Sequence, residues 1–221
     1  MYQELHLPIE KQARIYTYGA LSSQTQFLWI ACHGYGQQAK RFARKFQFLD
    51  PQRHFVICPE GLSRFYVKGF SGEVGASWMT KEDRLIEIED YCNYLNKVWK
   101  NFTSKAPNAK VQLLGFSQGC ATLCRWIYNQ GNLSYDRLIL WAGIIPEDLP
   151  WKTEAPKRFR EQPIHFVYGT EDPFISEQRS QSFKVFAQNQ NLHNLVYHPF
   201  EGSHKVDRKV FEQLCNTWNL L

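Results

Sequence analysis

The sequence lacks the features of membrane-spanning, secreted and disulfide-stabilised proteins. No window is long and apolar enough to cross a bilayer, and the first residues, Met1 to Leu7, lack the basic head and apolar run of a signal peptide. The six cysteines are scattered and form no CxxC pair, so neither a zinc site nor a disulfide framework is indicated. We therefore expect a cytoplasmic protein with reduced thiols, no bound metal and no membrane span.

A concentrated run of positive charge is also missing, although the formal net charge is +5. The basic residues are dispersed and no nucleic-acid-binding motif accompanies them, so we expect no nucleic acid as a partner. The densest group is Lys40, Arg41, Arg44 and Lys45, on an expected helix. A solvated helical face is the favoured interpretation of this group, and an anionic docking patch is the alternative.

Internal repeats and low-complexity linkers are absent as well. The length of 221 residues suits one domain, and a hydrophobic fraction of 43% allows a substantial core. We expect a single domain over residues 1–221.

Strand-like and helix-like segments alternate through most of the chain. We expect buried strands at short apolar runs, and helices where apolar residues recur at spacings of three and four. The expected strands are 27–32, 54–58, 111–114, 137–141, 164–168 and 195–200, and the expected helices are 38–49, 81–102, 118–129, 176–190 and 206–214. Shorter strands at 3–9 and 14–18 suggest an antiparallel start to the sheet. The alternation predicts the α/β class, with a mostly parallel, doubly wound sheet flanked by helices.

The pentapeptide Gly115-Phe116-Ser117-Gln118-Gly119 lies where an apolar strand meets a helix. It fits G-x-S-x-G, the strand-turn-helix elbow that presents a nucleophilic serine. The turn is so tight that the flanking positions lack room for a Cβ atom, which favours glycine at both. The helix that follows directs its N-terminal N–H groups at developing negative charge. The alternative is an ordinary turn whose serine caps the helix.

Two later strand ends supply an acid and a base. The carboxyl ends of parallel strands meet at one edge of a sheet, and Asp172 and His204 follow the strands 164–168 and 195–200. A serine hydroxyl is a weak nucleophile at neutral pH, so it needs a base, which His204 can be, oriented by a carboxylate, which Asp172 can be. The order Ser117, Asp172, His204 is the hydrolase order. Taken singly, Asp172 could instead start a turn, and His204 could cap the last helix.

Such chemistry also needs an oxyanion hole made of two backbone N–H groups. We expect one from Gln118, the residue after the nucleophile. The other should come from the loop His33-Gly34-Tyr35-Gly36 at the end of the strand 27–32, where Tyr35 is the favoured donor and Gly36 the alternative.

These motifs resemble the cap-less α/β-hydrolases of the phospholipase/carboxylesterase family, which includes the acyl-protein thioesterases. The elbow is similar to that family's elbow, and the loop 33–36 is similar to its oxyanion loop. The segment Ala76-Ser77-Trp78 is similar to the family's tryptophan-containing segment near the acyl pocket. The resemblance spans roughly residue 27 to the C-terminus and implies the α/β-hydrolase fold without a large cap domain. The residues that match the family's triad and oxyanion donors are Ser117, Asp172, His204, Tyr35 and Gln118.

Three positions depart from the family pattern. Cys120 stands where a further glycine is usual, Gln37 follows the oxyanion loop where an acidic residue is frequent, and Ser203 precedes His204 where glycine is common. The triad survives these changes, but the substrate does not follow from the family.

The irregular stretch from residue 60 to 80 is rich in glycine and aromatic residues. A connection of this length is usually functional or ordered by its own packing. We expect a pocket wall here, with Phe65, Tyr66, Phe70 and Trp78 lining an apolar acyl pocket. The alternative is that some of these rings fill the core beneath a long loop.

The sequence thus predicts a serine hydrolase that cleaves a carboxylic ester or thioester of small or medium acyl length through an acyl-enzyme. Its partner is the small-molecule ester or thioester substrate, and a triad of this type needs no cofactor. The alternative is a hydrolase-fold protein that binds a ligand or partner without catalysis. The departures at Cys120 and Ser203 and the aromatic-rich stretch from Phe65 to Trp78 give this alternative some support. No oligomeric state follows from the sequence.

Overall fold

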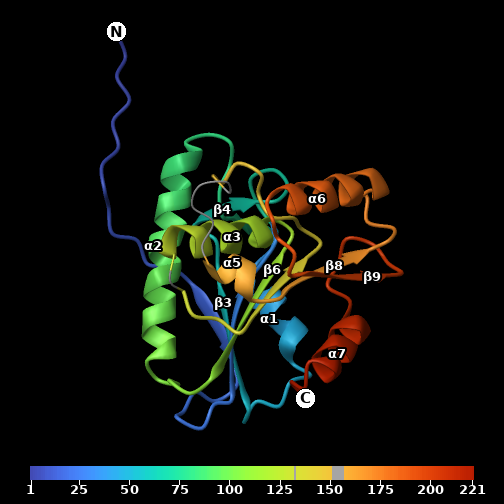
Figure 1. The fold of residues 1–221 in the computed structure, drawn as a ribbon. Helices are drawn as coiled ribbons and strands as arrows, with labels where there is room; N and C mark the ends of the chain where they lie inside the picture. The colour runs from blue at the N-terminus through green and yellow to red at the C-terminus, as the bar shows by residue number, and fades with distance from the viewer. Residues whose placement is uncertain (132, 151–156) are drawn as a thin grey trace.

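The computed structural model describes residues 1–131, 133–150 and 157–221. Seven strands form one sheet in the order β1-β3-β2-β6-β7-β8-β9, drawn in Figure 1. β1 is antiparallel to β3, and the other neighbouring pairs are parallel. The strands are β1 (Ile15–Tyr18), β2 (Phe27–Cys32), β3 (His54–Pro59), β6 (Lys110–Phe116), β7 (Arg137–Trp141), β8 (Ile164–Gly169) and β9 (Leu195–Phe200). The predicted fold class, with a mostly parallel sheet, is confirmed.

Helices cover both faces of the sheet because side chains alternate along each strand. In β2, Leu28 and Ile30 join one core cluster, whereas Trp29 and Ala31 join the other. The first cluster packs against α2 (Arg84–Thr103), α3 (Gln118–Gln130), α5 (Lys157–Glu161) and α6 (Glu177–Asn189). The second packs against α1 (Ala39–Ala43), the short 3₁₀ helix η1 (Arg44–Phe46) and α7 (Arg208–Thr217). Covered on both sides, β2 is buried along its whole length, as the continuous apolar run predicts.

The N-terminal residues 3–9, which we expected to form a strand, do not form one. They are exposed and have no regular secondary structure, and Figure 1 shows the N-terminal segment running away from the sheet. The alternation of Leu5, Leu7 and Ile9 imitates a strand, but Pro8 lacks an N–H donor and β1 already occupies the sheet edge beside β3. The second expected N-terminal strand is present as β1.

The stretch from residue 60 to 80 is less irregular than the sequence indicates. It contains β4 (Ser63–Tyr66) and β5 (Val74–Ser77), which pair antiparallel as a separate two-stranded sheet. A bridge between Gln37 and Ala76 joins this hairpin to the segment after β2. The hairpin therefore lies against the loop expected to form the oxyanion hole.

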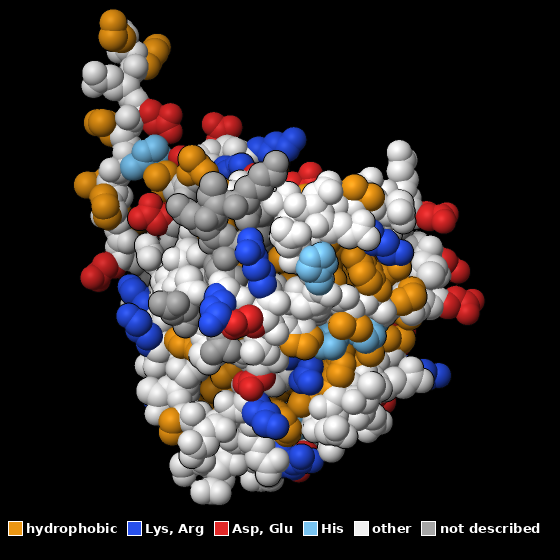
Figure 2. Space-filling model, in the orientation of Figure 1, with side chains coloured by type: hydrophobic (Ala, Val, Ile, Leu, Met, Phe, Trp, Pro, Cys, Tyr) orange, Lys and Arg blue, Asp and Glu red, His pale blue; other side chains and the backbone are white. Residues whose placement is uncertain are grey.

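The surface in Figure 2 shows hydrophobic side chains on the extended N-terminal segment and a second group in the region of α6, β8 and β9. Among the described residues, no helix combines the length and apolar character needed to cross a membrane. All six cysteines are buried free thiols.

Candidate active site

The loops that follow the central strands meet at the carboxyl edge of the sheet. Backbone hydrogen bonds of 2.8–2.9 Å join the segment after each strand to the next strand. After β6 the Ser117 N–H donates to the Trp141 carbonyl of β7, after β7 the Ala142 N–H donates to the Val167 carbonyl of β8, and after β8 the Thr170 N–H donates to the Phe200 carbonyl of β9. One edge of the sheet thereby carries the elbow serine and the loops that hold Asp172 and His204.

Ser117 occupies a strained turn between β6 and α3. Its φ of 52° and ψ of −115° are rare for a residue other than glycine and persist only where the surroundings impose them. The Ser117 side chain does not cap α3, so the alternative of an ordinary capped turn does not describe this segment. A Cβ atom at Gly115 would lie 2.6 Å from the Cys120 nitrogen, and one at Gly119 would lie 2.1 Å from the Cys32 oxygen. These close approaches explain both glycines of the G-x-S-x-G pattern.

Asp172 and His204 face each other across the ends of β8 and β9. The Nδ1 atom of His204 lies 2.7 Å from Oδ2 of Asp172, whose side chain is 0% exposed. The other carboxylate oxygen accepts the Phe174 N–H at 2.8 Å, so Asp172 also starts a turn. With Nδ1–H donating to the carboxylate, Nε2 of His204 is left as a proton acceptor. The N-cap of α7 is Asp207, and His204 is therefore not a helix cap.

Two aromatic rings hold the His204 imidazole beside the elbow. The Phe116 ring, one residue before Ser117, lies 5.0 Å from the imidazole between ring centres. The Phe174 ring meets it edge-on at 4.7 Å and is itself 60% exposed. The sequence analysis did not identify Phe174 as a residue beside His204. The sequence feature that could have indicated this role is its position two residues after Asp172.

Trp141 connects the elbow to the loop of His204. Its carbonyl oxygen accepts the Ser117 N–H at 2.9 Å, and its indole Nε1 donates to the Lys205 carbonyl at 2.9 Å. The side chain is buried and packs against Phe200. One rigid residue therefore contacts the backbone at both loops, a role that the sequence analysis missed.

The loop at residues 33–36 is held against β5. The Gly36 N–H donates to the Ala76 carbonyl at 2.9 Å, and the Gly34 N–H donates to Oε1 of Gln37 at 3.0 Å. Within the described residues, no hydrogen bond engages the Tyr35 N–H. Gly36, the alternative oxyanion donor, is thus occupied, which favours Tyr35.

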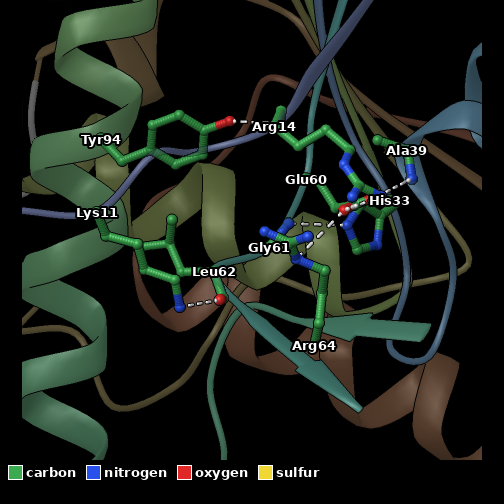
Figure 3. Close-up of polar contacts among 9 residues, drawn as sticks. All are labelled: Lys11, Arg14, His33, Ala39, Glu60, Gly61, Leu62, Arg64 and Tyr94. Carbon is green, nitrogen blue, oxygen red and sulfur yellow. Dashed lines mark hydrogen bonds and ion pairs between the residues drawn. The ribbon is translucent and has the colours of Figure 1, made fainter. Parts of the chain in front are cut away.

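His33 supports this loop from the buried side. Its Nδ1–H donates to the Gly34 carbonyl at 2.8 Å, and its Nε2 accepts the Gly61 N–H at 3.0 Å, the latter visible in Figure 3. Burial lowers the pKa of His33 to about 4, so the ring is neutral near pH 7. The Trp78 indole donates to the His33 carbonyl at 2.9 Å. These contacts make His33 a structural residue of the loop.

Glu60, next to Gly61, attaches the start of α1 to the same region. Its side chain is 2% exposed, and Oε2 accepts the Ala39 N–H at 3.2 Å. The guanidinium groups of Arg14 and Arg64 lie 3.5 and 3.8 Å from Oε1. Figure 3 draws both side chains beside Glu60. This carboxylate thereby links α1 to β4 and to Arg14, the residue directly before β1.

Gln118 contributes more than the backbone N–H that the sequence analysis assigned to it. Its side-chain Oε1 accepts the Trp78 N–H at 3.1 Å, and its Nε2 donates to the Met79 carbonyl at 2.7 Å. Because Gln118 is the first residue of α3, its own N–H has no partner within the helix. The side chain therefore fixes the segment after β5 while the N–H stays available for an oxyanion.

The aromatic residues expected to line a pocket lie in different environments. Phe65 is half-buried and its ring packs against the Tyr35 ring, tilted by 32° with 5.3 Å between ring centres. Tyr66 and Phe70 are 49% and 97% exposed on the hairpin. The structure thus brings Phe65 to the oxyanion loop and leaves Phe70 at the exposed tip.

Trp78 is only 1% exposed and belongs to the core. Its ring packs against His33 and Tyr91. For this residue the alternative interpretation, a ring that fills the core beneath the loop, agrees with the structure.

Cys120 is accommodated by a small residue on a neighbouring segment. It is buried, and a Cβ atom at Gly143 would come within 2.7 Å of its sulfur. Burial raises the pKa of the Cys120 thiol, which keeps it protonated. Cys120 is a core residue and supplies no second nucleophile.

Within the described residues, one trio of side chains has the spacing of metal ligands: Glu4, His6 and Asp83. All three are exposed and lie outside the loops of the candidate active site.

Comparison with known proteins gives one family match and several solved structures with a similar fold. The model of the phospholipase/carboxylesterase family matches residues 20–220. No curated protein has a significantly matching sequence. Among solved structures, acyl-protein thioesterase 2 of Zea mays superposes with a TM-score of 0.70 at 16% identity, covering 95% of this chain and 100% of that one. Esterase PE8 gives 0.68 at 19% identity over 96% and 100% of the chains, and the Bacillus cereus carboxylesterase gives 0.66 at 16% identity over 94% and 93%. At these identities the structures show a shared fold.

Proposed function

Because the chain belongs to the phospholipase/carboxylesterase family, we propose that it is a serine hydrolase that cleaves a carboxylic ester or thioester of small or medium acyl length. The observation that carries the proposal is the 2.7 Å contact between Nδ1 of His204 and the buried carboxylate of Asp172. The packing of the same imidazole on Phe116, next to Ser117, supports the assignment of His204 as the base. The similar solved structures named esterase, carboxylesterase and thioesterase support an ester or thioester substrate.

In the first half of the proposed reaction, Ser117 becomes acylated. Nε2 of His204 takes the hydroxyl proton as Oγ attacks the carbonyl carbon, and Asp172 stabilises the imidazolium that forms. The negative charge that develops on the carbonyl oxygen is held by the N–H groups of Tyr35 and Gln118. His204 then gives its proton to the departing alcohol or thiol, which leaves Ser117 esterified.

In the second half, water removes the acyl group. His204 takes a proton from the water as it attacks the acyl carbon, the same two N–H groups hold the second oxyanion, and the proton returns to the Ser117 oxygen. Each step uses side chains and main-chain groups of this chain, and no cofactor takes part. The six buried thiols fit the cytoplasmic location that we also propose.

The proposal is tested with p-nitrophenyl butanoate and the Ser117→Ala variant. Removing the nucleophile should lower kcat by at least about 10⁴-fold. Ser23→Ala, an exposed serine before β2, is the matched control and should keep full activity. Equal rates in the wild-type and Ser117→Ala proteins would overturn the proposal.

Labelling by a fluorophosphonate separates catalysis from mere ligand binding. An activated Ser117 should form a covalent phosphonyl adduct that mass spectrometry locates on the elbow peptide, and Ser117→Ala should form none. A wild-type protein without adduct and without turnover would instead be a hydrolase-fold binding protein.

A further inference from the structure

A cavity of about 270 Å³ lies beside the oxyanion loop. Its lining combines two cationic side chains, two amides, one carboxylate and one aromatic ring around a glycine: Arg41, Lys45, Gln37, Gln38, Glu73, Phe42 and Gly36. Arg41 lies on α1 and Lys45 on η1, four positions apart, so both can face the same space.

One shared loop and two contacts connect the lining of this cavity to segments of the candidate active site. Gly36 belongs to the loop that offers the Tyr35 N–H. The ring of Phe42 lies 6.3 Å from the ring of Phe116, which directly precedes the nucleophile. Nζ of Lys45 donates to the Val206 carbonyl at 3.3 Å, two residues after the catalytic base. Residues that line the cavity thus belong to the oxyanion loop on one side, at Gly36, and contact Val206 after His204 on the other, through Lys45.

Positive charge in the cavity is only weakly compensated. Arg41 forms an ion pair with Glu73, but the two side chains are 59% and 53% exposed. An exposed pair of this kind contributes little free energy, so a ligand anion can displace the carboxylate. The hydrogen bond from Lys45 goes to a neutral carbonyl, which leaves the charge of the ammonium group in place.

We infer that this cavity binds an anionic group of the substrate, a carboxylate or a phosphate, while the scissile carbonyl lies at Ser117. Guanidinium and ammonium groups are the side chains that bind such anions. The inference rests on the proposed function and narrows it, because the preferred ester or thioester then carries a negative charge near its reacting carbonyl.

The inference also divides the basic group of residues 40–45. All four residues are exposed, but Arg41 and Lys45 line the cavity, whereas Lys40 and Arg44 do not. The first pair serves the anionic site and the second forms a solvated face.

The test compares matched charged and neutral substrates. For an anion on the acyl side, mono-p-nitrophenyl glutarate is compared with p-nitrophenyl pentanoate, which has the same chain length. For an anion on the leaving group, 3-carboxyphenyl pentanoate is compared with 3-carbamoylphenyl pentanoate. The wild-type protein should have a higher kcat/KM for the charged member of one pair than for its neutral partner. The double substitution Arg41→Gln and Lys45→Gln should reduce this charged-to-neutral ratio of kcat/KM about tenfold.

Matched controls distinguish a site from general surface charge. Lys40→Gln combined with Arg44→Gln removes the same charge from the same segment and should leave the ratio unchanged. Glu73→Gln should raise it, because the competing carboxylate is gone. Inorganic phosphate should inhibit the charged substrate competitively, and less so in the Arg41, Lys45 double variant.

The outcomes separate this inference from the proposed function. Hydrolysis that persists in Ser117→Ala contradicts the proposed function itself. The second outcome is hydrolysis that depends on Ser117 but shows the same charged-to-neutral kcat/KM ratio in the wild type and in the Arg41, Lys45 double variant. If this holds for both substrate pairs, it overturns the anionic site alone. Thermal melting checks that each variant is folded.

Discussion

Nδ1 of His204 lies 2.7 Å from Oδ2 of Asp172, and the Asp172 side chain is completely shielded from solvent. The contact fixes the tautomer that leaves Nε2 free to accept a proton. Asp172→Asn keeps the shape of the side chain but removes its charge and favours the other tautomer, so kcat should fall by about 10⁴-fold. The hydrolysis of p-nitrophenyl butanoate measures the effect.

The neighbouring Glu171 offers a control for this change. Glu171→Gln removes a carboxylate with the same formal charge as Asp172 from an exposed position in the same loop, and it should leave kcat unchanged. If the two variants lose activity equally, the assignment of Asp172 as the orienting acid is wrong.

Trp141 should affect turnover only by positioning other groups, because its carbonyl oxygen binds the elbow and its indole binds the residue after His204. Trp141→Phe retains an aromatic ring in the core but loses the donor to the Lys205 carbonyl. The loss of one such hydrogen bond costs about 1 kcal/mol of stability. We expect kcat to fall about tenfold, with KM for p-nitrophenyl butanoate unchanged.

Trp126→Phe is the matched control, since the buried Trp126 indole on α3 donates to Asn96 on α2 at 2.7 Å. It should lose similar stability, measured by urea unfolding, and retain kcat. A kcat of Trp141→Phe that stays at the wild-type value would remove Trp141 from the positioning residues.

The elbow could be predicted from sequence because its cause is local. Gly115 and Gly119 have no space for a Cβ atom, and that constraint is visible within five residues of sequence. The meeting of Asp172 and His204 could also be predicted, because parallel strands direct their carboxyl ends to one edge. Their catalytic roles remain predictions.

The features that the sequence analysis missed depend on contacts between distant segments. Trp141 reaches the backbone of Lys205, and the pairing of β5 with Gln37 depends on where the hairpin docks. A local pattern carries no information on either contact. For the same reason the alternation at residues 3–9 was misleading, since a strand forms only where a sheet edge is free to pair with it.

The free energy of unfolding should fall on acidification, because the protein contains buried neutral histidines. The pKa of His33 is about 4 in the folded protein, below the ordinary value of 6.5, because burial disfavours the charged ring. Between these two values the unfolded chain binds a proton that the native state does not, so stability falls as the pH decreases through this window. A shift of this size corresponds to about 3 kcal/mol. His165, whose pKa burial and the neighbouring His198 lower to about 3, acts in the same direction.

Urea unfolding at pH 7.0, 5.5 and 4.5 measures this dependence, and nitrogen chemical shifts of His33 report its protonation directly. The ring should stay neutral, with the proton on Nδ1, at pH 5. A His33 that is protonated at pH 5 in the folded protein, or a free energy of unfolding that is constant from pH 7.0 to 4.5, would contradict the prediction.

Acyl-chain selectivity should depend on Phe65 and not on Trp78. Trp78 is 1% exposed, so Trp78→Ala should cost about 3–5 kcal/mol of stability and lower activity toward all chain lengths alike. Phe65 is half-buried and packs against Tyr35 in the oxyanion loop, so Phe65→Ala should change the kcat/KM profile over p-nitrophenyl acetate to octanoate. Its stability loss should stay near 1 kcal/mol, because the ring is partly in water already.

Phe70→Ala is the control, because it removes the same ring from a site that is 97% exposed, and it should leave the chain-length profile unchanged. A change of profile in Phe70→Ala equal to that in Phe65→Ala would show that the hairpin as a whole, and not the Phe65 contact with the oxyanion loop, sets the chain length.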